Sequence, residues 1–412
     1  MKNVSHALTA VLLLLLPLQL NKYFWISDSL ISGVRVDYVA PTVYFTDFII
    51  LLAFLLSFRK GYFLGFIKSH LFLLSCIASF FLFSFFSLMQ SPHPFIGLFW
   101  TGKILLVFLF TFTLISSVRE KGVFWVIQWF IFGMVWVSIL GIAQFVFQQS
   151  VGFSFLGERP LAVDVFGIAR MSFAGKEFIR AYGTFPHPNV FASYLVTALI
   201  LIRWFPLRHL RLPFFALFLL ALLCTGSRFF LLYYAGLILV QVFQKTHSRK
   251  INTRLIVFLG ALFLFLSFSY SFSLDEQSVQ ERLGLNIAAI QIIFQHPFWG
   301  VGPHQILYTI QNYYRATRTS FFLQPPHNAY LLLLSEVGVL GVIPVFFFMA
   351  SVVQSTWKRH RAAIPLLLVI ILGGMIDHFY VTLHHGLLLV AFIFSLCVLI
   401  PQKKVFHESY LV

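Results

Sequence analysis

His327 has a residue type and a position suited to acid–base chemistry. It follows Pro325 and Pro326 and stands, with Asn328, where a long polar segment leads into an apolar run. Imidazole has the side-chain pKa that lies nearest neutral pH, so His327 is a candidate general base. A structural histidine at a membrane interface is the alternative, and the residue type alone leaves both open. Asn328 is a candidate helix cap or substrate ligand.

A second histidine, His187, lies between Pro186 and Pro188 at the start of another apolar run. The two prolines restrict the backbone there. His187 is therefore a candidate substrate ligand, with a structural role at the start of a helix as the alternative.

Three arginines are candidates for binding phosphate. The planar guanidinium stays charged and matches pairs of phosphate oxygens. Arg180 and Arg228 lie at the expected outer ends of apolar runs, and Arg282 lies at the start of an expected surface helix. For each arginine the alternative is an interfacial side chain that holds a lipid headgroup.

Acidic residues are few, and none are paired at a spacing suited to a divalent cation, so we predict no metal and no cofactor. Glu336 and Asp377 fall within apolar runs, where a charge is costly, and hydrogen bonding between helices is the expected role. No glycine-rich phosphate loop or serine nucleophile elbow occurs, which argues against a nucleotide-driven machine or a serine hydrolase.

The composition is that of a polytopic membrane protein. Of the 412 residues 59% are hydrophobic and 10% are charged, far fewer charges than in soluble domains. The apolar runs are too long for barrel strands, so helices are expected. The net charge of +16 lies mainly in short connections, which fits cytoplasmic loops rather than a nucleic-acid surface. The three cysteines all lie in apolar runs, which argues against disulfides.

The apolar runs predict an all-α fold of about 12 transmembrane helices in one integral membrane domain, residues 1–412. Basic residues at alternate connections place both termini in the cytoplasm. Two outer loops are expected, at 149–187 and at 273–327. Lys103 lies inside the fourth run and is interpreted as a lysine that reaches the outer interface. The expected runs are approximately 4–26, 42–58, 71–90, 95–117, 123–148, 190–205, 212–224, 229–243, 255–272, 328–353, 363–380 and 386–400.

The larger outer loop contains a segment with helical periodicity, Val279 to Gln295, whose apolar residues recur every three or four positions. This spacing predicts a short amphipathic helix on the membrane surface that ends at Pro297. After His327, Gly338 and Gly341 are expected to let another helix pack closely against the tenth run.

These features together resemble the O-antigen ligase and O-antigen polymerase (Wzy-like) superfamily of bacterial envelope glycosyltransferases. The most specific match is His327-Asn328 followed, after nine residues, by Gly338-Val339-Leu340-Gly341. The turn from Gln295 to Gly302, the segment Arg180 to Phe185 and the turn Thr225 to Arg228 support it. The resemblance covers much of residues 130–345.

The resemblance implies a GT-C-like fold and a metal-independent, inverting glycosyl transfer. The donor would be an undecaprenyl-diphosphate-linked glycan, and the acceptor a sugar hydroxyl of a glycan or glycolipid. The reaction would take place at the outer face of the bacterial cytoplasmic (inner) membrane, among membrane lipids and without nucleic acid. The resemblance also implies that Arg228 and Arg180 bind the diphosphate and that His327 orients or deprotonates the acceptor.

The choice between ligase and polymerase stays open, because the sequence does not name the acceptor. A transporter or flippase is the alternative of a different class, since about 12 spans with cytoplasmic termini also describe many transporters. The candidate polar residues gather at the outer face rather than at the midplane, which favours interfacial chemistry.

Overall fold

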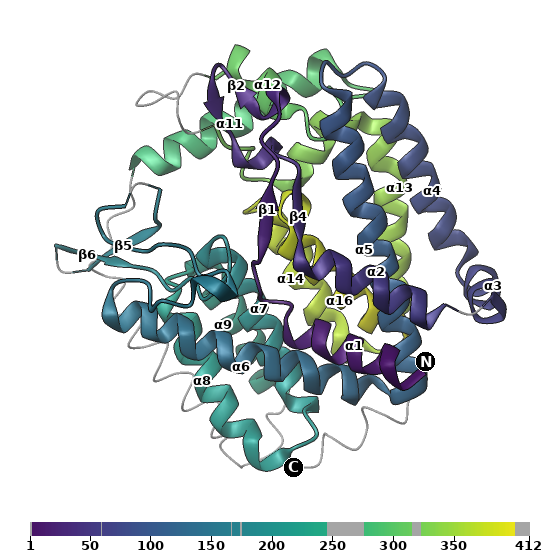
Figure 1. Ribbon diagram of the computed structural model, residues 1–412, viewed down its shortest axis with the longest axis vertical. Coiled ribbons are helices and arrows are strands. Elements are labelled where there is room, and N and C mark those ends of the chain that lie inside the picture. The colour runs from purple at the N-terminus through teal and green to yellow at the C-terminus, as the bar shows by residue number, and fades with distance from the viewer. Residues whose placement is uncertain are drawn as a thin grey trace. The chain divides into compact units, whose positions relative to one another are not determined.

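The protein is mostly helical, with six short strands, in the described part of the chain (Figure 1). The computed structural model describes residues 2–58, 60–165, 167–173, 175–244, 276–314 and 323–399. The chain divides into two compact units. The first comprises Met1–Thr9, Asn21–Arg119 and Asp275–Val405, and the second comprises Ala10–Leu20, Glu120–Leu274 and Phe406–Val412.

Four described helices are long and apolar enough to cross a membrane: α4 (Leu71–Leu88), α5 (Pro94–Lys121), α6 (Val123–Phe147) and α13 (Ala329–Arg359). Six shorter apolar helices accompany them. The expected membrane character is therefore supported, and the number of about 12 spans stays a prediction. The expected ninth run, the basic segment before it and the basic C-terminal tail lie outside the described residues.

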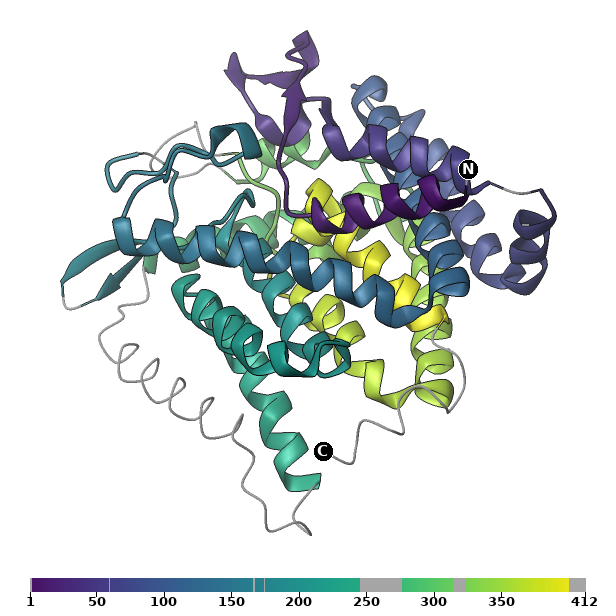
Figure 2. The same cartoon turned by 60° about the horizontal axis from the view of Figure 1, so that its bottom comes forward.

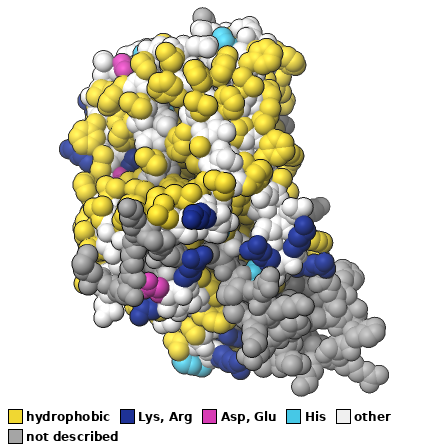
Figure 3. All heavy atoms as spheres, turned by 90° about the vertical axis from the view of Figure 1, so that its right-hand side faces the viewer, with side chains coloured by type: hydrophobic (Ala, Val, Ile, Leu, Met, Phe, Trp, Pro, Cys, Tyr) yellow, Lys and Arg dark blue, Asp and Glu magenta, His cyan; other side chains and the backbone are white. Residues whose placement is uncertain are grey.

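Large apolar side chains remain exposed along α4 and α13, among them Leu71, Phe85, Phe346 and Phe347. Hydrophobic side chains cover most of the upper part of the face seen in Figure 3. A surface of this kind is disfavoured in water and is suited to lipid.

The remaining helices of the first unit are α2 (Phe45–Ser57), α3 (Lys60–Ser69), α11 (Glu276–Gln295), α12 (Ile306–Thr309), α14 (Ile364–Gly374), α15 (Phe379–Thr382) and α16 (His384–Leu399). Two antiparallel ribbons precede α2. In one, β1 (Asn21–Tyr23) pairs with β4 (Thr42–Tyr44), and in the other β2 (Leu30–Ile31) pairs with β3 (Val34–Arg35). The unit also contains the 3-10 helices Ser27–Ser29, Asp37–Val39, Ile310–Asn312 and Arg361–Ala363.

The first helix is shorter than the expected run to residue 26. Helix α1 (Lys2–Leu14) ends three residues before Pro17, and residues 21–23 form β1 instead. Proline cannot donate a helical hydrogen bond, and it disfavours helical geometry in the residue before it, so the helix ends ahead of Pro17.

Helix α13 is broken at Gly338, whose φ of 64° and ψ of −176° are not helical. The turn at 297–302 forms hydrogen bonds with α13 on both sides of this break. Val301 N–H donates to Ser335 O and Gly302 N–H to Glu336 O, both at 2.9 Å, while Val339 N–H donates to Pro297 O at 2.9 Å. Leu340 N–H donates to Phe298 O at 3.3 Å. The expectation that Gly338 accommodates a second helix is therefore wrong, because a Cβ at Gly338 would meet the backbone of this turn.

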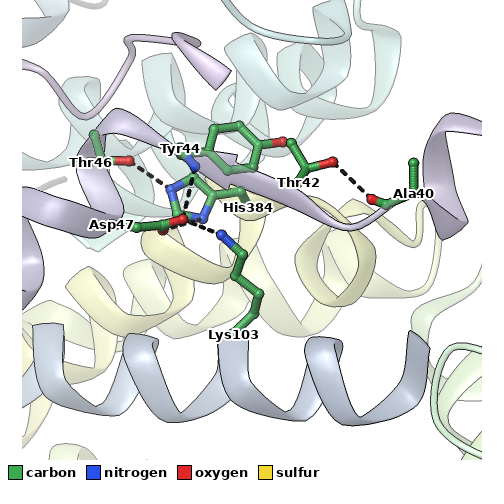
Figure 4. Close-up of polar contacts among 7 residues, drawn as sticks. All are labelled: Ala40, Thr42, Tyr44, Thr46, Asp47, Lys103 and His384. Atoms are coloured by element: carbon green, nitrogen blue, oxygen red, sulfur yellow. Dashed lines mark hydrogen bonds and ion pairs between the residues drawn. The ribbon is translucent and has the colours of Figure 1, made fainter. Parts of the chain in front are cut away.

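Lys103 does not reach the interface as expected, because it forms a buried ion pair with Asp47 (Figure 4). The side chains of Lys103 and Asp47 are 14% and 7% exposed. Tyr44 N–H donates to Asp47 Oδ2 at 2.8 Å, and the ring of His384 stacks on Tyr44 at 4.0 Å between centroids. The charge on Lys103 is thus compensated by a partner from α2.

The second unit contains the helices α6, α7 (Pro188–Leu201), α8 (Arg211–Cys224) and α9 (Arg228–Gln244); α6 is blue and the other three are teal in Figure 2. Helix α8 packs on α6 and α7, and α7 also contacts α9. The expected loop at 149–187 carries a hairpin in which β5 (Arg170–Phe173) pairs with β6 (Lys176–Ile179). Three 3-10 helices, Ser154–Leu156, Ile202–Trp204 and Arg208–Leu210, complete the unit.

Candidate active site

His327 lies immediately before α13, where Asn328 caps the helix. Asn328 Oδ1 accepts from Tyr330 N–H at 3.0 Å and from Leu331 N–H at 3.1 Å. Its amide nitrogen donates to Met375 O at 3.3 Å. The expected cap is therefore present, and it fixes the backbone that carries His327.

The structure places Asp377 and His378 beside His327. The ring centroids of His327 and His378 lie 5.4 Å apart, and one ligand atom from each of the three residues lies within 4.8 Å of the others. Asp377 and His378 are 6% and 3% exposed. Asp377 was expected to form hydrogen bonds between helices, and His378 was not predicted to belong to a site. Two adjacent polar residues in an apolar run were the available signal, since such residues mark functional sites in membranes.

Hydrogen bonds determine which nitrogen of His327 carries the proton. Its Nε2 lies 3.0 Å from Gln324 Oε1, which can only accept, so the proton is on Nε2. Its Nδ1 then keeps a lone pair. This atom is buried and has no hydrogen-bond partner among the residues that the structure describes. A buried lone pair of this kind is an acceptor for a hydrogen-bond donor that enters the site.

The imidazole of His327 is neutral because burial lowers its pKa to about 3. The carboxylate of Asp377 raises the pKa of His327, whereas His378 and Arg282 lower it further. Burial also lowers the pKa of His378, again against the influence of Asp377. The two imidazoles thus face a carboxylate while both are uncharged.

Arg282 lies on α11, which packs against α13. Its charge acts on both His327 and His378, so the guanidinium is close to this cluster. It forms no hydrogen bond or ion pair with the described residues. Helix α11 buries Ala288, Ala289 and Ile292 in a core shared with Leu332 of α13.

The opposite face of α11 exposes Leu283, Ile287 and Phe294. The predicted helix is therefore confirmed, and it presents an exposed apolar stripe. Its location on a membrane surface stays a prediction.

In the second unit, Arg180 is held by the turn at 225–228. Its Nε donates to Thr225 O at 2.6 Å, and its Nη2 donates to Asn189 Oδ1 at 2.9 Å. Ser227 also donates to Asn189 Oδ1, at 3.1 Å. Arg180 thus joins the segment that it begins to the turn at 225–228, although Arg180 and Thr225 are 45 residues apart in sequence.

Arg228 is the first residue of α9. The amino end of a helix carries a partial positive charge, so a cation there is unfavourable unless an anion is bound. The N–H groups at the start of a helix and a guanidinium together suit an anion such as phosphate.

His187 caps α7, since its Nδ1 accepts from Asn189 N–H at 3.1 Å. Pro188 follows as the first residue of that helix. This arrangement accounts for the two prolines around His187. A role of His187 in binding substrate stays a prediction.

The candidate residues thus belong to two groups. His327, Asn328 and Arg282 lie in the first unit together with Asp377 and His378. Arg180, His187 and Arg228 lie in the second unit. Within the described part of the chain, His327, Asp377 and His378 form the one group of three or more potential ligands that lie close enough to hold a metal ion.

A comparison with protein families finds a match for an internal segment of the chain. Residues 191–346 match the family Wzy_C, described as O-antigen ligase. The matched segment contains Arg228, Arg282, His327 and Asn328, while Arg180 and His187 precede it. No curated protein matches the chain. The predicted resemblance to the O-antigen ligase and polymerase superfamily is confirmed.

Proposed function

We propose that this chain, with its O-antigen ligase segment at 191–346, is a membrane glycosyltransferase. It moves a glycan from an undecaprenyl-diphosphate donor to a hydroxyl of a glycan or glycolipid acceptor. The reaction inverts the anomeric centre and needs no metal ion. It takes place at the outer face of the bacterial cytoplasmic membrane, with both termini in the cytoplasm.

The observation that carries this proposal is the buried lone pair of His327 Nδ1. An acceptor hydroxyl donates a hydrogen bond to this atom and is thereby oriented toward the anomeric carbon. The new C–O bond forms as the bond from the anomeric carbon to the diphosphate oxygen breaks. The hydroxyl proton passes to Nδ1, and the electron pair of the broken bond leaves with the diphosphate.

Asp377 stabilises the imidazolium that this transfer creates. Its carboxylate is among the groups that act on His327, and it favours the charged ring. The low pKa of His327 suits a base that holds the hydroxyl first and accepts its proton late. Late transfer is adequate because an oxocarbenium-like carbon attracts the oxygen before the proton leaves.

The arginines offset the charge of the departing diphosphate. Arg228 does so at the amino end of α9, where the helix dipole adds to its charge. Arg180 is preorganised by Thr225 and Asn189, so little reorganisation accompanies binding. Arg282 supplies a cation near His327. Charge stabilisation of this kind is the role that a metal ion has in other transferases.

Asn328 and His187 have supporting roles. Asn328 fixes the start of α13 and thereby the position of His327. His187 uses Nδ1 to cap α7, so it contacts a glycan through Nε2.

The test uses purified protein in vesicles with a lipid-linked oligosaccharide and a supplied acceptor. We expect new glycosidic bonds, and a loss of about 10²–10⁴-fold in rate for His327→Ala. Arg228→Ala is expected to lose activity similarly. His209→Ala, at an exposed position in the other unit, is the matched control and keeps full activity.

The products distinguish the alternatives. A ladder of lengthening chains indicates a polymerase, and a single transfer to the acceptor indicates a ligase. Full activity of both His327→Ala and Arg228→Ala refutes the mechanism. Solute flux without new bonds supports the transporter instead.

A further inference from the structure

We propose that His327, Asp377 and His378 form a binding site for a divalent transition-metal ion, with Zn²⁺ as the best fit. The bound ion blocks the acceptor hydroxyl and so inhibits transfer. The binding site follows from the geometry alone, whereas its inhibitory effect rests on the proposed function.

The first argument is the direction of the lone pairs. Gln324 accepts from His327 Nε2–H, which leaves a lone pair on the buried Nδ1. Thr382 Oγ1 lies 2.7 Å from His378 Nδ1 and 3.3 Å from His378 O, so with the proton on Nδ1 the hydroxyl accepts from the ring and donates to the carbonyl. In this arrangement each imidazole has its N–H held by an outer partner and keeps a lone pair on its other nitrogen. This is the usual arrangement of histidines that bind metals.

The second argument is the spacing of the donors. One atom from each residue lies within 4.8 Å of the others, and Asp377 and His378 are buried while His327 is half-buried. Donors around tetrahedral zinc are separated by about 3.4 Å when the metal–ligand distance is about 2.1 Å. Small side-chain rotations that move the donor atoms by about 1 Å therefore complete the site. His327 Nδ1, unsatisfied among the described residues, gains a partner when the ion binds.

The third argument is the chemistry of the donor set. Two imidazoles and one carboxylate suit zinc and other late transition metals, whereas Mg²⁺ and Ca²⁺ prefer oxygen ligands alone. Three protein ligands leave a fourth position for water. The negative charge of Asp377 offsets the cost of burying the cation, whereas the positive charge of Arg282 disfavours binding of the cation.

Binding of zinc and binding of the acceptor exclude each other. Both need the lone pair of His327 Nδ1. Zinc should therefore inhibit competitively with the acceptor, and a chelator should restore the rate.

The experiment titrates Zn²⁺ into the full chain, stripped with a chelator and held in detergent, by calorimetry. Co²⁺ absorption then reports the coordination geometry. We expect one site per chain and a tetrahedral Co²⁺ spectrum. Asp377→Asn and His378→Gln should each weaken binding at least tenfold. Arg282→Gln should tighten it, because a nearby positive charge is removed.

His209→Gln is the control for binding to exposed histidines and should leave the titration unchanged. Absence of a zinc site in the wild-type protein overturns the inference whatever the variants do. Binding that survives in both Asp377→Asn and His378→Gln also overturns it. Zinc binding in a protein that transfers no glycan refutes the proposed function alone, and transfer that is insensitive to zinc refutes the inhibitory role.

Discussion

Replacing Gly338 with alanine is expected to displace the turn at 297–302 from α13. With φ at 64° and ψ at −176°, Gly338 occupies a backbone region that is essentially restricted to glycine. A Cβ at this position would meet the backbone of Phe298 and Trp299. Backbone atoms cannot rotate away as a flexible side chain can, so the turn itself must move.

The magnitude follows from what that movement breaks. Holding a non-glycine residue in this conformation costs about 1–3 kcal/mol. Four backbone hydrogen bonds join the turn to α13, and each contributes about 0.5–1.5 kcal/mol. We therefore expect Gly338→Ala to lower the free energy of unfolding by at least ~3 kcal/mol, a large share of the stability of an ordinary domain.

Equilibrium unfolding in detergent micelles measures this loss. Gly102→Ala is the matched control, because Gly102 lies in α5 and a Cβ there would meet no atom within 4 Å. Alanine is favoured over glycine in a helix by about 1 kcal/mol, so the control should be at least as stable as the wild type. Equal stability of Gly338→Ala and the control would refute the docked turn.

Two further substitutions test contacts described above, by the same unfolding measurement. Asp47→Asn or Lys103→Met alone should destabilise the protein by about 3–5 kcal/mol, because each leaves a buried charge without its partner, and the double variant should recover most of that loss. A double variant no better than the worse single variant would contradict the ion pair. Asn328→Ala should cost about 1 kcal/mol through loss of the cap, while Asn328→Asp should retain most of the stability. Equal losses in both would show that the cap is unimportant.

Much of the helical pattern was predictable from the sequence. The expected run 71–90 corresponds to Leu71–Leu88 and the run 123–148 to Val123–Phe147, because apolar length determines where such helices lie. The cap at Asn328 was also predictable, since its signal is local. The family resemblance was carried by short motifs of the same local kind, and the match at 191–346 confirmed it.

Partners distant in sequence were not predictable. Lys103 and Asp47 are 56 residues apart, and nothing in either run identifies the other. Asp377 and His378 follow His327 by about 50 residues, so their proximity depends on how α13 and α14 pack. Hydrophobic periodicity reports that a face is buried but does not report what covers it.

The break in α13 divides one helix into two with separate uses. The 21 residues from Val339 to Arg359 extend about 31 Å at 1.5 Å per residue, which already matches the apolar thickness of a bilayer. The nine residues from Ala329 to Val337 are therefore not needed to cross it. They form an arm of about 13 Å whose direction is set at Gly338 and whose amino end carries His327. A change in the angle at Gly338 would swing His327 sideways by several ångströms without altering how the longer helix sits in the lipid.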